Sequence, residues 1–164
     1  MDDAARLSNP AVSAAIGLIW REAELLDRKD YKAWLNLWSD KGYYVIPIDP
    51  KTTDFAATLN YVYDDHALRV MRVERMSGGY SASATDAART VRTVSRFVVG
   101  ESEGTMIEIR SSQVVLGNKH GTMTLFGADL THRIQITDGE AKIIDKVIRL
   151  IDSTEALNAI GFLL

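Results

Sequence analysis

The sequence has no cysteine among its 164 residues. A cysteine nucleophile, a thiolate zinc site and a cysteine-ligated iron–sulfur cluster all need that side chain, so this chain cannot provide them by itself. A protein without cysteine also suits a reducing compartment, and we expect a cytoplasmic location.

Histidine is scarce as well, with only His66, His120 and His132. Two histidines and a carboxylate can hold iron, but His120 lies in an expected turn at residues 118–121. His66 and His132 are far apart and no motif joins them. We therefore expect no metal site in this chain, since isolated histidines are usually structural or solvated.

Neither charge nor hydropathy points to nucleic acid or membrane. The chain has 19 basic and 22 acidic side chains, a net charge of −3, and 46% of its residues are hydrophobic. It contains no apolar run long enough for a membrane span, and residues 1–6 lack the pattern of a signal peptide. These features predict one globular domain, residues 1–164, with a substantial core.

Helices are predicted in the first half of the chain. Asn9 followed by Pro10 is a start signal, and apolar residues then recur at helical spacing to about residue 27. Asp30 can cap a short second helix, and Asp65 can cap a third that runs to about residue 76. Aromatic residues at helical spacing usually pack inward, so we expect core positions rather than a substrate pocket for Trp20, Tyr31, Trp34 and Trp38.

Strands follow a different period. Residues 43–48 and 59–63 are expected to form short strands. Alternation predicts long strands further on: one that begins at residue 89, and others at 105–117, 122–137 and 140–151. Asp138-Gly139 is a strong hairpin signal. In the first long strand, alternation places five residues on one face: Val91, Thr93, Ser95, Phe97 and Val99.

Together these elements predict an α+β fold. Three N-terminal helices would pack on a long-stranded antiparallel sheet, which must curve strongly around them like a cone. A polar, small-residue segment at residues 77–88 is expected to be a loop.

Several short segments follow one another in a characteristic order. They are Glu-Ala-Glu-Leu-Leu-Asp at 22–27, Tyr31 with Trp34 and Leu35, Tyr44 with Pro47, Tyr-Asp-Asp at 63–65, Arg-Val-Glu-Arg-Met at 72–76, and Arg-Thr-Val-Arg at 89–92. Their order and spacing resemble the beta (small) subunits of aromatic-ring-hydroxylating (Rieske-type) dioxygenases, in the NTF2-like and SnoaL-like superfamily. The prolines and asparagine that this family carries around residues 86–96 are missing here.

The resemblance implies a non-catalytic structural subunit of an oxidoreductase for aromatic compounds. Its partner would be a larger alpha subunit that carries a Rieske [2Fe–2S] cluster and mononuclear Fe(II). The beta chains would form a trimer within an α3β3 hexamer. This chain would hold no cofactor, which agrees with its lack of the two cysteines that a Rieske cluster needs.

Two groups of residues are candidates for subunit contacts. Arginines are dense around the loop at 77–88, where they could be solvated or could form forked ion pairs with a neighbouring subunit. The apolar end of the chain is expected to pack on the sheet or on a neighbouring protomer. The candidates are Arg72, Arg75, Arg89, Arg92, Arg96, Phe162, Leu163 and Leu164.

A different hypothesis is a stand-alone SnoaL-like cyclase, dehydratase or isomerase. Asp145 or His132 would act as acid or base inside the cone, with Tyr43 or Tyr63 assisting. Buried polar groups are more often simply hydrogen-bonded, so we favour a structural role for them. A third hypothesis is a binding module for a small molecule, which the fold alone cannot separate from the others.

Overall fold

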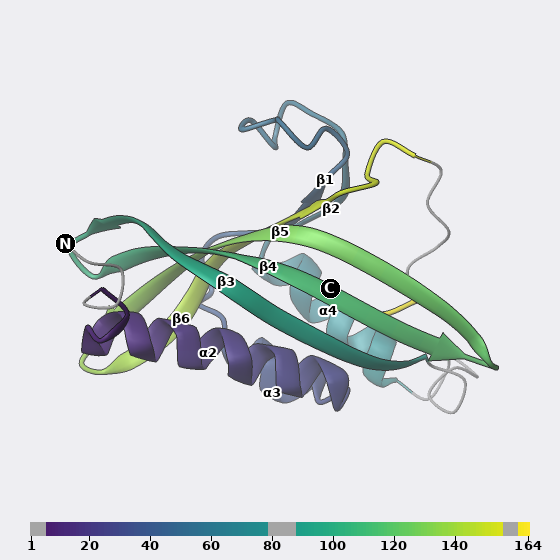
Figure 1. Ribbon diagram of the computed structural model, residues 1–164, viewed down its shortest axis with the longest axis horizontal. Helices are drawn as coiled ribbons and strands as arrows, with labels where there is room; N and C mark the ends of the chain where they lie inside the picture. Colours follow the sequence, from purple (N-terminus) through teal and green to yellow (C-terminus); the bar gives the residue numbers. More distant parts are fainter. Residues whose placement is uncertain (1–5, 79–87, 156–160) are drawn as a thin grey trace.

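The computed structural model describes residues 6–78, 88–155 and 161–164, and three helices lie wholly within these ranges. Two of them precede a sheet of six strands in the sequence, and the third lies between its second and third strands (Figure 1). The helices are α2 (Pro10–Asp27), α3 (Tyr31–Leu35) and α4 (His66–Ser77). The strands are β1 (Tyr44–Pro47), β2 (Asn60–Asp64), β3 (Arg89–Glu103), β4 (Met106–Lys119), β5 (Thr122–Thr137) and β6 (Glu140–Leu150).

The predicted helix starts are confirmed by their capping geometry. Asn9 Oδ1 accepts a hydrogen bond from the Ala11 amide at 2.9 Å. Asp30 caps α3 in the same way, and Asp65 Oδ1 accepts from the Leu68 amide at 2.9 Å. Each side chain satisfies a backbone donor that has no partner within the first turn of its helix.

The sheet order is β2-β1-β6-β5-β4-β3, so β2 and β3 are its open edges. The expectation of a purely antiparallel sheet is wrong at one pairing, because β1 runs parallel to β6. The short hairpin β1–β2 is thus added to the edge of a four-stranded meander. The long strands bend and twist above α2, which lies along one face of the sheet (Figure 1).

Strand β3 does not alternate regularly as predicted. Its pairing with β4 shifts between Ser95 and Val98, and Arg96 has a positive φ of 55°. The extra residue is a β-bulge, which reverses the face on which later side chains lie. Val91 is therefore 59% exposed, whereas Phe97 packs against the core.

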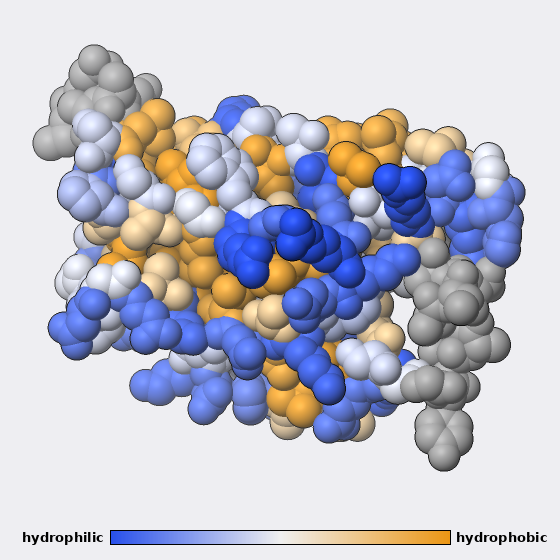
Figure 2. Space-filling view, turned by 90° about the horizontal axis from the view of Figure 1, so that it is seen from below, coloured by the Kyte–Doolittle hydropathy of each residue, from blue (hydrophilic) through white to orange (hydrophobic). Residues whose placement is uncertain are grey.

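The core lies between α2, α3 and the inner face of the sheet, which is the face toward α2. As predicted, Trp34 and Trp38 are buried, and their rings meet edge to face at 5.5 Å. Trp20 is 57% exposed instead, because it lies at the margin of the core against Phe97. Seen from below, the molecule shows a mosaic of hydrophilic and apolar side chains (Figure 2).

The apolar end of the chain docks inside its own protomer. Leu163 and Leu164 are buried, and Phe162 meets Phe126 edge to face at 5.7 Å. The Tyr44 hydroxyl accepts from the Leu164 amide at 3.1 Å and lies 3.2 Å from its carbonyl oxygen. The loop predicted at 77–88 lies largely outside the described residues, as do residues 156–160. In the described part, no helix is long and apolar enough to cross a bilayer.

We expect Leu164→Ala to lower the free energy of unfolding by about 2–4 kcal/mol, because it removes a buried side chain and leaves a cavity. Ile151→Ala is the control, since Ile151 is 82% exposed and its loss should cost no more than about 0.5 kcal/mol. Urea unfolding of both variants measures the difference. Equal stabilities would contradict the docked position of Leu164.

Candidate functional site

Among the described residues, two groups of polar side chains lie on opposite sides of the sheet. The first is a cluster in the core around Glu22, which the helical spacing of α2 turns toward the sheet. The second is a pocket on the outer face of the sheet, away from α2. The cluster is buried and the pocket is open to solvent, so the two differ in the ligands that could reach them.

In the buried cluster, both carboxylate oxygens of Glu22 are engaged. Oε1 accepts from Trp34 Nε1 at 3.0 Å and from Lys146 Nζ at 3.0 Å. Oε2 accepts from His132 Nε2 at 2.8 Å. Glu22, His132 and Lys146 are each no more than 2% exposed. A carboxylate only accepts hydrogen bonds, so His132 carries its proton on Nε2.

Burial and charge act against each other in this cluster. Burial alone would raise the pKa of Glu22, but Lys146, His132 and Trp34 outweigh it and hold that pKa well below its ordinary value. Burial lowers the pKa of His132, although its hydrogen bond to Glu22 opposes the change. Burial also lowers the pKa of Lys146, against the attraction of Glu22. The cluster is a buried Glu22–Lys146 ion pair with a neutral imidazole beside it.

The same side chains hold the end of the chain. Lys146 Nζ donates to the Leu164 carbonyl at 2.8 Å, so one ammonium links α2 to the terminal segment. A second link runs through Arg92, whose Nε donates to Asp27 Oδ1 at 2.8 Å. Arg92 Nη2 donates to the Leu163 carbonyl at 3.1 Å. These contacts pair most polar atoms of the cluster internally, as in a structural site, and leave His132 Nδ1 and Arg92 Nη1 without a hydrogen-bond partner.

Sequence reasoning did not single out Glu22 or Lys146 as site residues, although a signal was present. Glu22 stands three positions after Ile19 and four before Leu26, on the buried stripe of its helix. Lys146 shares the inward face of β6 with Ile148. A charged residue on an otherwise apolar inward face predicts a buried partner of opposite charge.

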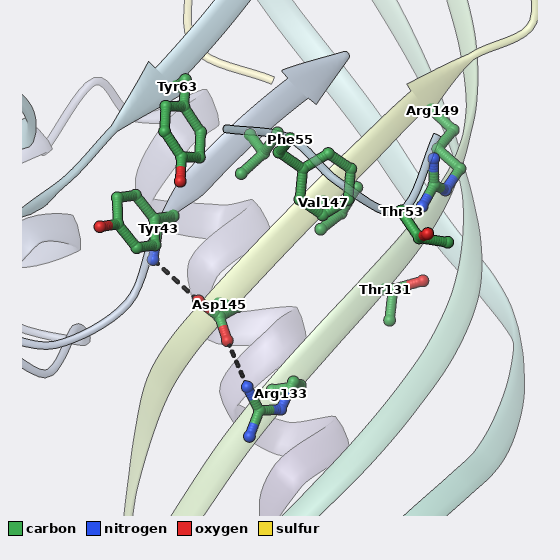
Figure 3. A pocket seen from close by; sticks show the side chains of 10 residues that line it. Tyr43, Thr53, Phe55, Tyr63, Thr131, Arg133, Asp145, Val147 and Arg149 are labelled. Carbon is green, nitrogen blue, oxygen red and sulfur yellow. Dashed lines mark hydrogen bonds and ion pairs between the residues drawn. The ribbon is translucent and has the colours of Figure 1, made fainter. Parts of the chain in front are cut away.

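The pocket on the outer face has a volume of about 370 Å³. It is built from the start of β1, the segment before β2, β2 itself, β5 and β6 (Figure 3). Its walls combine aromatic, aliphatic and charged side chains. The lining residues are Tyr43, Val45, Thr53, Phe55, Tyr63, Thr131, Arg133, Asp145, Val147 and Arg149.

Asp145 belongs to this pocket and not to the interior. Its Oδ1 accepts from the Tyr43 amide at 2.8 Å, and its Oδ2 accepts from Arg133 Nη1 at 2.8 Å (Figure 3). Gly42 makes this approach possible: a Cβ there would lie 2.1 Å from the Ile144 carbonyl and 2.7 Å from the Asp145 carboxylate. Its φ of 77° also favours glycine.

The acid–base arrangement of the stand-alone enzyme hypothesis is therefore not formed. His132 is fully buried on the inner face, whereas Asp145 lies on the outer face, so the sheet separates them. A shift of register between β5 and β6 causes this: Arg133 pairs with Asp145, but Ile134 pairs with Ile143. The extra residue on β6 brings Ile143 inward with the even-numbered residues that follow. Tyr43 and Tyr63 stack on each other with ring centroids 4.6 Å apart and line the outer pocket.

The five candidate arginines fall in different environments. Arg72 forms a forked pair with Asp64, through Nε at 2.5 Å and Nη2 at 3.0 Å. Arg92 is buried against Asp27, and Arg96 pairs with Asp129 on the surface. The side chains of the other two, Arg75 and Arg89, are exposed. The prediction that these arginines contact another subunit stays a prediction, and the internal pairing makes Arg72 and Arg92 the weakest candidates for it.

The three histidines do not come together. His132 binds Glu22, His66 Nδ1 lies 3.7 Å from Asp40, and His120 occupies the turn between β4 and β5. Across residues 6–78, 88–155 and 161–164, no group of three or more side chains could hold a metal ion. The donors present therefore do not fit a Rieske cluster or a histidine-ligated iron.

We expect Glu22→Gln to lower the free energy of unfolding by about 3–5 kcal/mol, because it leaves Lys146 buried without a counter-charge. Glu24→Gln, on the exposed side of the same helix, removes a surface carboxylate and should cost less than about 1 kcal/mol. Chemical denaturation at pH 7 compares the two. A small, equal effect would show that the buried pair does not hold the fold.

The stability of the protein should fall as the pH drops below about 6.5, the ordinary pKa of histidine. Below that pH, His132 binds a proton in the unfolded state but not in the folded state. Each pH unit therefore lowers the free energy of unfolding by up to about 1.4 kcal/mol. Below about 4.5 the contribution of Glu22 is lost as well, because its folded pKa is depressed. His132→Gln should flatten the slope between pH 7.5 and 5.5 in urea titrations. The control is His66→Gln, at a side chain that is 43% exposed, and it should keep the slope. An unchanged slope in both variants would rule out His132 as its source.

Known proteins resemble this chain in sequence and in structure. The family model described as "Ring hydroxylating beta subunit" matches residues 21–155. The small oxygenase component of a p-cumate 2,3-dioxygenase system from Pseudomonas putida is 27% identical over 146 residues, 88% of this chain and 80% of that protein. The small subunit of anthranilate 1,2-dioxygenase from Acinetobacter baylyi is 30% identical over 130 residues, 76% of this chain and 80% of that protein.

The fold agrees with the sequence matches. The beta subunit of benzoate 1,2-dioxygenase from Burkholderia mallei superposes with a TM-score of 0.73 at 19% identity, over 87% of this chain and 91% of that one. The NTF2-like α+β fold expected from the sequence is thereby confirmed. The hypothesis of a stand-alone SnoaL-like cyclase, dehydratase or isomerase is wrong, because these relatives are dioxygenase subunits. The chain belongs to the family of ring-hydroxylating dioxygenase beta subunits, and so to a multicomponent oxidoreductase.

Proposed function

We propose that this chain is a single-domain, non-catalytic assembly subunit, which acts in the cytoplasm in the breakdown of an aromatic compound. It would form a trimer and support three alpha subunits in an α3β3 hexamer. Each alpha subunit would carry the Rieske [2Fe–2S] cluster and the mononuclear Fe(II). The observation that carries this proposal is the match to the beta-subunit family over residues 21–155.

The chemistry of the side chains supports this division of labour. The chain has no cysteine, and its three histidines are scattered over a buried cluster, a helix start and a turn. A Rieske cluster needs two cysteines and two histidines, so that group must belong to the partner. The interior of the cone is occupied by the Glu22 cluster and the docked terminal segment, and contributes rigidity.

The outer face of the sheet carries a surface suited to subunit contact. Val91 pairs with Leu116, and Leu116 pairs with Leu125, so the three form one row across β3, β4 and β5. They are 59%, 44% and 64% exposed. An apolar row exposed on the surface of a sheet is typical of a surface that is covered in an assembly. Arg75, Arg89 and Arg96 add exposed or surface-paired guanidinium groups that could bind carboxylates of a neighbouring copy.

Co-expression with the larger subunit encoded beside it tests the proposal. Affinity capture through a tag on this chain should yield a brown complex that contains both chains, and native mass spectrometry should give three copies of each. The chain expressed by itself should be colourless. Iron bound to the isolated chain, or a captured chain without an iron-containing partner, would contradict the proposed role.

We expect Leu125→Glu to reduce the trimeric fraction in native mass spectra at least tenfold, because a buried unpaired charge would cost more than about 1.4 kcal/mol. Leu59→Glu is the matched control, since Leu59 is 79% exposed on a different part of the surface. Circular dichroism would check that both variants fold. An intact trimer in Leu125→Glu would place the contact elsewhere.

A further inference from the structure

The pocket on the outer face has a charge and an aromatic lining that the assembly role leaves unexplained. We propose that it binds a small organic monoanion, a carboxylate attached to a single ring or an apolar group of similar size. This inference does not depend on the number of subunits in the assembly, but it requires that the pocket stay open in the complex. It rests on the shape of the pocket, the balance of its charges and the way in which Arg149 is held.

The apolar part of the pocket is large enough for one ring. Its volume of about 370 Å³ lies at the lower end of the range of small-molecule sites, roughly 300–1,000 Å³. Val45 and Val147 are buried beneath it, and the rings of Phe55 and Tyr43 stand at its side (Figure 3). Tyr43 is held in place by Tyr63, whose ring is nearly parallel to it, with 3° between the planes. A flat hydrocarbon group would therefore meet surfaces that are already ordered.

The charges in the pocket do not cancel. Its lining has two guanidinium groups, Arg133 and Arg149, and one carboxylate, Asp145, which leaves one net positive charge. Asp145 is neutralised by Arg133 at 2.8 Å and also accepts the Tyr43 amide. Within the described residues, no carboxylate forms an ion pair with Arg149. Asp129, which lies opposite Arg149 on β5, pairs with Arg96 instead, so the remaining charge belongs to Arg149.

Arg149 is held in place by neutral groups, which leave its positive charge without a counter-ion. Its Nη1 donates to the carbonyls of Pro50 and Thr52 at 3.0 and 2.9 Å. Its guanidinium carbon lies 5.4 Å from the ring centre of Phe55. A guanidinium group has further N–H donors in a planar fork that matches a carboxylate. Because the group is already positioned, an anion would bind with little loss of side-chain entropy.

Two hydroxyl groups complete the polar side of the pocket. Thr53 lies beside Arg149, and Thr131 lies between Arg149 and Arg133 on the neighbouring strand (Figure 3). Hydroxyls can donate to a carboxylate oxygen as readily as they accept. A cation would find the carboxylate of Asp145 already engaged and a net positive lining. A neutral ring would gain the apolar contacts but would form no ion pair with Arg149.

Benzoate and benzamide, which share a ring and differ in charge, test the proposal on the full chain. Isothermal titration at low salt should show benzoate binding about tenfold or more tighter than benzamide, as expected for a charge-assisted forked contact. Hydrogen–deuterium exchange should show protection by benzoate at residues 53–58 and 131–133. Equal affinities of the two ligands, or protection elsewhere, would overturn the proposal. This comparison needs no variant and remains valid if substitutions harm folding.

Arg149→Gln should reduce the preference for benzoate to about one, while Arg149→Lys should keep part of it. Arg110→Gln is the matched control, because Arg110 is an exposed arginine on β4 that does not line this pocket. It should leave both affinities unchanged. Retention of the preference in Arg149→Gln, or its loss in Arg110→Gln, would refute the assignment.

A carboxylate could also come from an acidic side chain of a neighbouring subunit. The exchange experiment is therefore repeated on the complex purified with its partner. Protection of residues 53–58 and 131–133 by added benzoate in that complex supports a free small molecule as the occupant. If these residues are protected in the complex without ligand and benzoate adds nothing, the pocket is filled by protein and the proposal fails.

Discussion

The carboxylate of Glu22 joins parts of the protein that are distant in sequence. It binds Trp34 from α3, His132 from β5 and Lys146 from β6 at 2.8–3.0 Å. Through Lys146 it reaches the backbone of Leu164. An ion pair in the core costs desolvation and does not by itself make a protein more stable than an apolar core would. Its contribution is directional, because the three donors reach this one carboxylate only when α2, α3 and the sheet pack in this arrangement.

Irregularities in the strands decide what faces inward. The bulge at Arg96 turns Phe97 toward the core, and the register shift between β5 and β6 places Lys146 inside and Asp145 outside. As a result, side chains of the protein itself fill the space against the inner face of the sheet. The outer face keeps an apolar row and a charged pocket. A pocket open to solvent therefore lies on the outer face of the sheet, whereas the polar cluster around Glu22 is buried on the inner face.

This distribution is consistent with a subunit that works through shape and contacts. The same fold can enclose quite different sites, so the family match identifies the role more securely than the architecture does. The residues that the family motif contributes at 22–27 and 89–92 turn out to be structural: Glu22 and Asp27 each bind a buried cation, Lys146 and Arg92 respectively. The motif thus marks how the helix is attached to the sheet.

The sequence by itself determined the helix starts at Asn9, Asp30 and Asp65, the hairpin at Asp138-Gly139 and the inward aromatic residues Trp34 and Trp38. These follow from local capping, turn geometry and periodicity. Only the tertiary structure decided that β1 lies parallel to β6, that Arg92 is buried and that Asp145 faces outward. Each depends on strand register and on partners dozens of residues away, and one extra residue in a strand reverses every face that alternation predicts.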